Sequence, residues 1–155
     1  MAGQDSATGA PNGVDRVSFL LARHGGITSA RIRDALAEIG YSPRQGSTLM
    51  TLAETGKMSQ QALGETMGID PSVLVGILND LEGGELVERR RDPADRRRHI
   101  VAITAKGERA LADVRTVLAG VDRALFADLE AGELAQLRRL LAKVRTKPDD
   151  PACTE

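Results

Sequence analysis

Apolar residues recur at helical spacing between Val14 and Ile39. Five positions fall on one stripe, three or four residues apart: Val17, Leu20, Leu21, His24 and Ile27. Such a stripe predicts an amphipathic helix. Gly25-Gly26 interrupts the stripe and is expected to loosen or bend the helix, because glycine is costly in a helix interior. Gly40 is expected to end it.

Three shorter helices are predicted over residues 43–55, 59–67 and 71–82, mainly from their start and stop signals. Ser42-Pro43 and Asp70-Pro71 each place proline at the first helical position, where its missing N–H costs nothing. Ser59 and Asp70 are suited to cap their helices. Glycines at 68 and at 83–84 are expected to terminate the second and third of these helices.

Two strands and two long helices follow. Leu86–Arg91 and Arg98–Ile103 read as strands joined by the turn Asp92-Pro93-Ala94-Asp95. Thr104 is placed to cap a helix that reaches to about Asp128, and Glu130–Val144 predicts a last helix. The apolar stripes of these two helices contain Leu111, Val114, Leu118, Val121 and Leu125, and then Leu134, Leu137, Leu140, Leu141 and Val144.

This element order predicts a mostly α fold with a small β-hairpin. The short helix, tight turn and capped helix of residues 59–82 form a helix-turn-helix, and the hairpin after it is placed as a wing. The tails, 1–13 and 146–155, are expected to be disordered because small and polar residues dominate them. The whole chain of 155 residues has a length that suits one domain with one core.

The arginines of the predicted hairpin change the interpretation of the net charge, which is only −1. Six arginines lie between Arg89 and Arg98 and are offset by Asp92 and Asp95 alone, which leaves a local charge of +4. Arginine suits a narrow minor groove of DNA and can also neutralise phosphates. A basic hairpin that is merely solvated is the alternative, and the helix-turn-helix directly before it disfavours that alternative.

The helix of residues 71–82 has one apolar face and one face of small residues. Leu74, Ile77, Leu78 and Leu81 share the apolar face, which must be buried. The opposite face carries Ser72, Val75, Gly76 and Asn79. Small residues allow a helix to approach base edges, Ser72 and Asn79 can form hydrogen bonds, and Val75 can touch a thymine methyl group. A surface helix that simply carries small residues remains the alternative.

Phosphate contacts are expected at two other helix starts. Ser59 and Gln60 begin the short helix, whose free backbone N–H groups can bind a phosphate, and simple capping is compatible with that role. Arg44 is placed similarly near the start of the preceding helix and is a candidate phosphate contact.

The segment from Gly84 to Gly107 resembles the MarR family, the multiple antibiotic resistance type of regulator. The resemblance rests on Gly84-Glu85-Leu86-Val87-Glu88-Arg89, on Asp92-Pro93-Ala94-Asp95-Arg96-Arg97-Arg98 and on Ile103-Thr104-Ala105-Lys106-Gly107. It extends over about residues 14–144. The family's Asp-x-Arg wing motif falls on Asp95 and Arg97, which implies that Arg97 enters the minor groove and that Asp95 fixes the wing.

The resemblance also implies a homodimer that binds palindromic operators, and its function would be transcription regulation, most simply repression. The DNA-binding lobe is then expected at about residues 42–104, with dimerisation helices at about 14–39 and 105–145. One departure concerns the recognition helix, where the family often has Ser-Thr-Val-Ser/Thr-Arg and this chain has Ser72-Val73-Leu74-Val75-Gly76. Because of this departure, DNA recognition is expected to depend more on the wing, with Arg96, Arg97 and Arg98, on Asn79 and on DNA shape.

A ligand is a further implication of the resemblance, because family members often bind small aromatic or phenolic anions between the two lobes. His24, Tyr41 and Met50 are the candidate contacts, with core packing as the alternative for each. Oxidant sensing through a cysteine near the first helix is not expected, because the single cysteine is Cys153 in the C-terminal tail.

Other functional classes are disfavoured by what the sequence lacks. It contains no glycine-rich phosphate loop, no nucleophile elbow and no cluster of metal ligands, so we expect neither an enzyme nor a metal or cofactor site. No apolar run approaches the ~20 residues of a membrane span, and no signal peptide precedes Val14, so a cytoplasmic location is expected. A winged-helix module that binds proteins rather than DNA is the remaining rival, against which the arginine cluster argues.

Overall fold

The computed structural model describes residues 13–145 of the chain. In chain order its elements are η1 (Gly13–Asp15), α1 (Val17–Glu38), α2 (Pro43–Thr55), β1 (Met58–Ser59), α3 (Gln60–Met67), α4 (Pro71–Gly83), β2 (Val87–Arg91), β3 (His99–Ile103), α5 (Ala105–Leu125) and α6 (Ala131–Leu141). The predicted class, mostly α with a small β-hairpin, is confirmed. The expectations for residues 1–12 and 146–155, including Cys153, lie outside the described residues.

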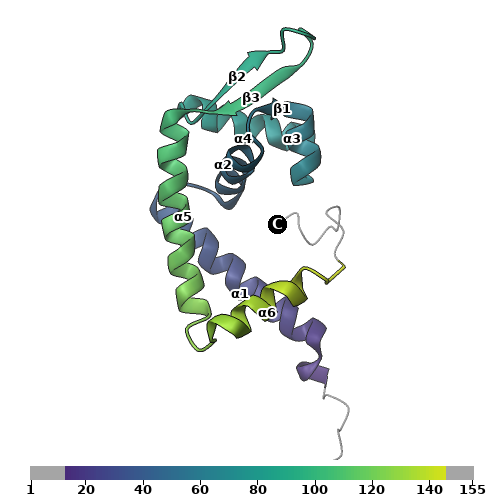
Figure 1. Ribbon diagram of the computed structural model, residues 1–155, viewed down its shortest axis with the longest axis vertical. Coiled ribbons are helices and arrows are strands. Elements are labelled where there is room, and N and C mark those ends of the chain that lie inside the picture. Colours follow the sequence, from purple (N-terminus) through teal and green to yellow (C-terminus); the bar gives the residue numbers. More distant parts are fainter. Residues whose placement is uncertain (1–12, 146–155) are drawn as a thin grey trace, which may run out of the picture.

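The long helix α5 organises the molecule. Figure 1 shows α2, α3, α4 and the sheet gathered at one end of α5, and α6 folding back at its other end. Helix α1 packs along α5, and α2 contacts both of them. The close approach is visible at Gly46 of α2, where an added Cβ would lie 3.4 Å from Val114 of α5 and 3.6 Å from Leu36 of α1.

The predicted first helix forms as α1, and Gly25-Gly26 does not break it. The helix is continuous over both residues. Glycine raises the free energy of a helix by about 1 kcal/mol but keeps its N–H group, so the hydrogen-bond ladder continues through it. Gly40 ends the helix as predicted, with φ of 81°, and the Tyr41 N–H donates to the Leu36 carbonyl at 2.9 Å.

Helix α2 is capped by Ser42, and α5 by Thr104 as predicted. The Gln45 N–H donates to the Ser42 hydroxyl at 3.2 Å, while the Ser42 N–H donates to the Gln45 side chain at 2.9 Å. These reciprocal bonds satisfy two of the N–H groups that a helix start leaves unpaired. Thr104 accepts a bond from the Gly107 N–H at 3.0 Å at the start of α5. Both long C-terminal helices end slightly earlier than predicted, at Leu125 and Leu141.

The end of α4 is followed by a non-glycine residue in the left-handed conformation. The helix ends at Gly83 as predicted, and Gly84 is right-handed, with φ of −81°. Glu85 instead has φ of 61°, and the Leu86 N–H donates to the Leu81 carbonyl at 2.8 Å. The Glu85 carboxylate pairs with Lys106 of α5 at 3.0 Å. The Thr104 hydroxyl donates to the Glu85 carbonyl at 2.7 Å, which helps to hold a conformation that non-glycine residues rarely adopt.

The sheet contains a third strand that the sequence did not reveal. Strand β3 lies between β1 and β2, and all pairs are antiparallel. Val87 lies opposite Ile103 and Arg91 opposite His99, so the two predicted strands pair as a hairpin. Strand β1 pairs Met58 with Val101 and Ser59 with Ile100. This pairing fastens the start of α3 to the base of the wing.

One hydrophobic cluster joins the helix-turn-helix to the sheet and to α5. Its most buried side chains come from every one of these elements: Leu49, Leu52, Leu63, Leu74, Leu78, Leu81, Val87, Val101 and Leu111. The cluster therefore fixes α4 and the wing as one body with the upper part of α5.

Candidate nucleic-acid interface

Helices α3 and α4 form the helix-turn-helix predicted from the sequence. Ser59 accepts a bond from the Ala62 N–H at 3.1 Å, and Gly68 ends α3 with φ of 63°. Gly64 lets α4 approach, because a Cβ there would lie 3.3 Å from Leu74. The Ile69 N–H donates to the Gly64 carbonyl at 3.0 Å, which fixes the turn. The angle between the two helices is therefore set by small residues and backbone bonds.

Helix α4 is buried on one side and open on the other. The apolar face packs into the core as predicted, through Leu74, Ile77, Leu78 and Leu81. Ser72, Val75, Gly76 and Asn79 are exposed, which confirms the predicted division of faces. Val73 is also exposed, to 37%, and was not among the predicted site residues. The exposed face thus carries two valines rather than one.

The polar groups of this face already have partners within the chain. The Asp70 carboxylate accepts bonds from the Ser72 N–H at 2.8 Å and from the Ser72 hydroxyl at 2.5 Å. These bonds lower the pKa of Asp70, the side-chain bond to the Ser72 hydroxyl contributing most. At the other end of α4, the Asn79 side-chain oxygen accepts a bond from Arg89 Nη2 at 2.6 Å. Asn79, a predicted DNA contact, is exposed and also belongs to a network at the base of the wing.

Arg89 links α4 to the wing. Its Nε donates to Glu82 Oε2 at 3.0 Å, and its backbone N–H donates to Glu82 Oε1 at 3.3 Å. The bond from the Arg89 guanidinium is the largest of the effects that hold the pKa of Glu82 below its ordinary value. One of the six clustered arginines is therefore a structural brace. The brace sets how the wing lies relative to α4.

We predict that Glu82→Gln destabilises the protein in a pH-dependent way. Because the folded pKa of Glu82 is lowered, its charge stabilises the fold at neutral pH, and this contribution is lost as the pH falls through the folded pKa. The Glu82 side chain is 40% exposed, so solvent screening limits the loss to about 1 kcal/mol at pH 7. Urea unfolding should show the difference from the unsubstituted protein shrinking as the pH is lowered.

Glu88→Gln is the matched control for that substitution. Its partner Arg90 lies at 2.9 Å but is 76% exposed, so we expect almost no change in the free energy of unfolding. A Glu82→Gln penalty that stays constant down to acid pH would show that packing, and not charge, is responsible.

The tip of the wing is folded by two aspartates. Asp92 accepts a bond from the Ala94 N–H at 2.9 Å, and Asp95 accepts one from the Arg97 N–H at 3.0 Å. The Asp95 carboxylate also lies 3.6 Å from Arg98 Nε. Asp95 is thus in position for the wing-fixing role that the resemblance implied. Its bonds hold the backbone of Arg97 while leaving the Arg97 side chain exposed.

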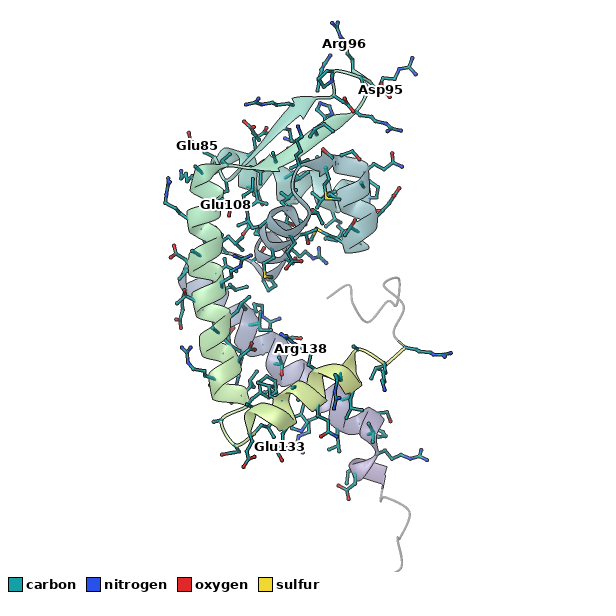
Figure 2. All side chains as sticks on the ribbon, in the orientation of Figure 1. Glu85, Asp95, Arg96, Glu108, Glu133 and Arg138 are labelled. Carbon is teal, nitrogen blue, oxygen red and sulfur yellow. The ribbon has the colours of Figure 1, made fainter. Side chains whose placement is uncertain are left out.

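Three wing arginines remain available for an outside partner. Among residues 13–145, ion pairs involve Arg89, Arg90 and Arg98, whereas Arg91, Arg96 and Arg97 have no acidic partner. All three are exposed. Figure 2 shows Arg96 at the far end of the hairpin, directed away from the rest of the molecule, with Asp95 beside it. The wing therefore presents positive charge at the end farthest from α6.

The other predicted DNA contacts lie at helix starts, as expected. Arg44 is exposed in the first turn of α2. Ser59 and Gln60 are half-buried at the start of α3, with the Ser59 oxygen occupied by its cap bond. The three residues lie in α2, in β1 and in α3, in the same lobe as the wing.

The predicted ligand residues are not equivalent in the structure. Tyr41 and Met50 are half-buried and pack against the hydrophobic core, the alternative that the sequence left open. His24 is exposed on α1. A different hollow, of about 710 Å³, lies between the end of α5 and α6 and is lined by apolar residues that include Phe126, Leu134 and Leu141.

Within the described part of the chain, no helix is both long and apolar enough to cross a bilayer. The same residues contain no cluster of three or more histidine, cysteine or acidic side chains able to hold a metal ion.

The sequence matches known regulators. Residues 41–99 match the sequence model of the MarR family. A transcriptional regulatory protein assigned to the hcr operon of Thauera aromatica is 32% identical over 114 residues, which make up 73% of this chain and 69% of that protein. A MarR-family transcriptional regulator of Rhodococcus sp. RHA1 is 31% identical with a TM-score of 0.76, over 85% of this chain and 94% of that one.

Two structures of the protein CouR are also similar. One is described as the transcriptional repressor CouR bound to a 23-mer DNA duplex, and it has a TM-score of 0.77 and 27% identity over 86% of this chain and 97% of that one. The other is CouR of Rhodococcus jostii RHA1 bound to p-coumaroyl-CoA, with a TM-score of 0.73 and 29% identity over 89% of this chain and all of that one, 100%.

Proposed function

The chain belongs to the MarR family of transcriptional regulators, and on this premise we propose that it is a repressor that binds a palindromic operator as a homodimer. The proposal is a binding function without catalysis, exercised in the cytoplasm. Its DNA contacts are α4 with Ser72, Val75, Gly76 and Asn79, the wing with Arg96, Arg97 and Arg98, and the helix starts with Arg44, Ser59 and Gln60. We add Val73 and Arg91 to these because both side chains are exposed beside them.

The observation that carries the proposal is the wing. Arg91, Arg96 and Arg97 have no acidic partner in the described part of the chain and lie beyond a helix-turn-helix whose outer face is exposed. In such an arrangement α4 enters the major groove while the wing reaches the adjacent minor groove. Asp95 supports this role by holding the tip, and CouR, which has the same fold, has been solved with DNA.

Selection of bound sequences from a pool of random duplexes tests the function. We expect a palindromic consensus. The logarithm of the binding constant for this consensus should fall linearly with the logarithm of the salt concentration. A variant lacking the charges of all three free arginines should lose most of that salt dependence. Absence of salt-dependent binding to any duplex would favour the rival, a winged-helix module that binds proteins.

The dimer interface is proposed at the end of the molecule opposite the wing. Within the single chain, apolar side chains of α1 and α6 are exposed, including Val17, Leu20, Leu21, Ile27, Leu134, Leu140 and Leu141. Apolar surface of this extent is unusual on a monomer and is covered when two copies associate. The two-fold symmetry then matches the two half-sites of a palindrome.

We predict that the protein sediments as a dimer. Sedimentation equilibrium at micromolar concentration should give about twice the chain mass of 16.5 kDa. Leu140→Glu, which places a charge on an exposed leucine of α6, should shift the protein toward monomer and weaken operator binding, whereas Glu108→Gln on α5 should leave the mass unchanged. A monomeric unsubstituted protein would contradict the model of two half-sites.

We also propose that a small aromatic or phenolic ligand weakens DNA binding by favouring a dimer whose recognition helices no longer match successive major grooves. Support comes from CouR, which has been solved with p-coumaroyl-CoA. Of the predicted contacts, His24 is exposed, whereas Tyr41 and Met50 are half-buried and pack against the hydrophobic core. A ligand acts in this way through different affinities for the two states.

A further inference from the structure

The recognition helix of this chain has no positive charge. The charged residues of α4 are Asp80 and Glu82, and its N-cap is Asp70. Affinity for the phosphate backbone must therefore come from the wing and the helix starts. What α4 itself can contribute is contact with base edges, and the chemistry of its exposed face limits which contacts those are.

Hydrogen bonds within the chain occupy much of the polar capacity of that face. The Ser72 hydroxyl donates its single hydrogen to Asp70, so it can offer only an acceptor to a base. The Asn79 oxygen accepts a bond from Arg89, which uses one of its two lone pairs and ties the side chain to the base of the wing, so its bidentate pairing with adenine is restricted. Asp80 is exposed, but a carboxylate in the major groove can accept only from a base amino group and is repelled by phosphates.

The apolar part of the face is unoccupied. Val73 is 37% exposed and Val75 is 38% exposed. At 100° per residue they flank the strip formed by Ser72, Gly76 and Asn79, one valine on each side. A Cβ added at Gly76 would meet nothing within 4 Å, so packing within the chain does not require glycine there. The glycine lowers the helix surface between the two valines, and their methyl groups are the exposed apolar groups on either side of it.

Only one base presents an apolar group in the major groove, and that group is the C5-methyl of thymine. We propose that Val73 and Val75 determine the operator sequence by packing against thymine methyl groups, so that each half-site carries thymines at the positions facing them. This inference rests on the proposed DNA-binding function and assigns its specificity. The wing arginines supply the affinity, and the valines supply the choice of sequence.

Replacement of thymine by deoxyuridine in the selected operator tests the assignment, because it removes the methyl group and keeps the base pair. Burial of one methyl group stabilises by about 0.8 kcal/mol, so affinity should fall about fourfold for each contacted thymine and about fifteenfold when both symmetric half-sites are changed. The affected positions should be few and symmetric about the centre of the palindrome.

Valine variants identify the residue that reads each methyl group. In Val75→Ala and Val73→Ala, the loss of affinity caused by deoxyuridine, called the uracil penalty, should disappear at the position that each valine contacts. Both side chains are exposed, so the variants should fold, which circular dichroism checks. Val14→Ala, which shortens a valine that is 76% exposed in η1, is the control and should keep the full uracil penalty.

The outcomes separate this inference from the function on which it rests. If the protein binds no selected duplex, the proposed function fails. If it binds a duplex and uracil is neutral at every position, DNA binding stands and methyl recognition is overturned. If uracil weakens binding equally in the unsubstituted protein and in both α4 variants, DNA shape or another residue reads the thymines, which also overturns the assignment.

Discussion

Gly107→Ala is expected to destabilise the protein by at least about 3 kcal/mol, or to prevent folding altogether. An added Cβ at this position would lie 2.0 Å from the Leu86 carbonyl oxygen and 2.7 Å from Ile103 Cγ1. Neither obstacle is a flexible end of a side chain that could turn away. Relief requires α5 to move off the start of β2, and overpacking of this kind outweighs the ~1 kcal/mol that alanine gains in helix propensity.

The joint at Gly107 is held by bonds that such a movement would break. The Leu86 carbonyl accepts bonds from the Thr104 N–H at 3.0 Å and from the Thr104 hydroxyl at 3.2 Å. Thr104 in turn caps α5 through the Gly107 N–H. One small residue therefore allows α5 to dock on the DNA-binding lobe. Loss of this docking should appear in urea unfolding as a lower midpoint.

Gly120→Ala is the matched control, since it makes the same change in the same helix. The only atom that its Cβ would approach is Arg123 Nη2, at 3.8 Å, at the end of a flexible side chain. We expect a gain in stability of up to about 1 kcal/mol. A Gly107→Ala protein as stable as the unsubstituted one would mean that α5 and β2 are not joined as described.

Local chemistry made most of the fold predictable. Ser59, Asp70 and Thr104 marked helix starts correctly because a capping side chain and the N–H that it bonds are two or three residues apart. The hairpin followed from its turn residues in the same way. Gly107 belongs to the motif that carried the family resemblance. The reason why glycine is needed there, its close contact with Leu86, depends on how two elements pack.

What the sequence did not reveal depends on tertiary contacts. Strand β1 has two residues, too few for any periodicity, and exists because β3 lies beside it. Asn79 and Arg89 are ten positions apart, and their bond could not be inferred before the wing was placed against α4. The exposure of Val73 was within reach of helical periodicity, since it lies away from the buried leucines.

The hydrophobic faces of α1 and α6 also depend on contacts that the sequence does not reveal. Their periodicity predicted amphipathic helices correctly, but in the single chain the apolar faces are largely open. A sequence pattern shows that a face must be covered without showing what covers it. The single chain supplies part of the cover through α5, and the rest is assigned to the second copy in the proposed dimer.

Arg97→Ala is expected to weaken operator binding by about 1–3 kcal/mol for each wing without unfolding the protein. The Arg97 side chain is exposed and has no acidic partner within residues 13–145, so its loss should change the free energy of unfolding by no more than about 0.5 kcal/mol. The bond between Asp95 and the Arg97 N–H is a backbone bond and survives the substitution. The wing therefore keeps its shape and loses one groove-directed guanidinium.

Arg97→Lys keeps the charge and should therefore lose less affinity than the alanine variant. It should still lose some, because lysine cannot reproduce the planar fork of the guanidinium. Arg115→Ala, at an exposed position of α5, removes the same charge away from the wing and should leave affinity nearly unchanged. Fluorescence anisotropy with a labelled operator at moderate salt measures all three variants. Equal affinities for the Arg97→Ala and Arg115→Ala proteins would remove the wing tip from the binding mechanism and leave α4 and the helix starts to account for it.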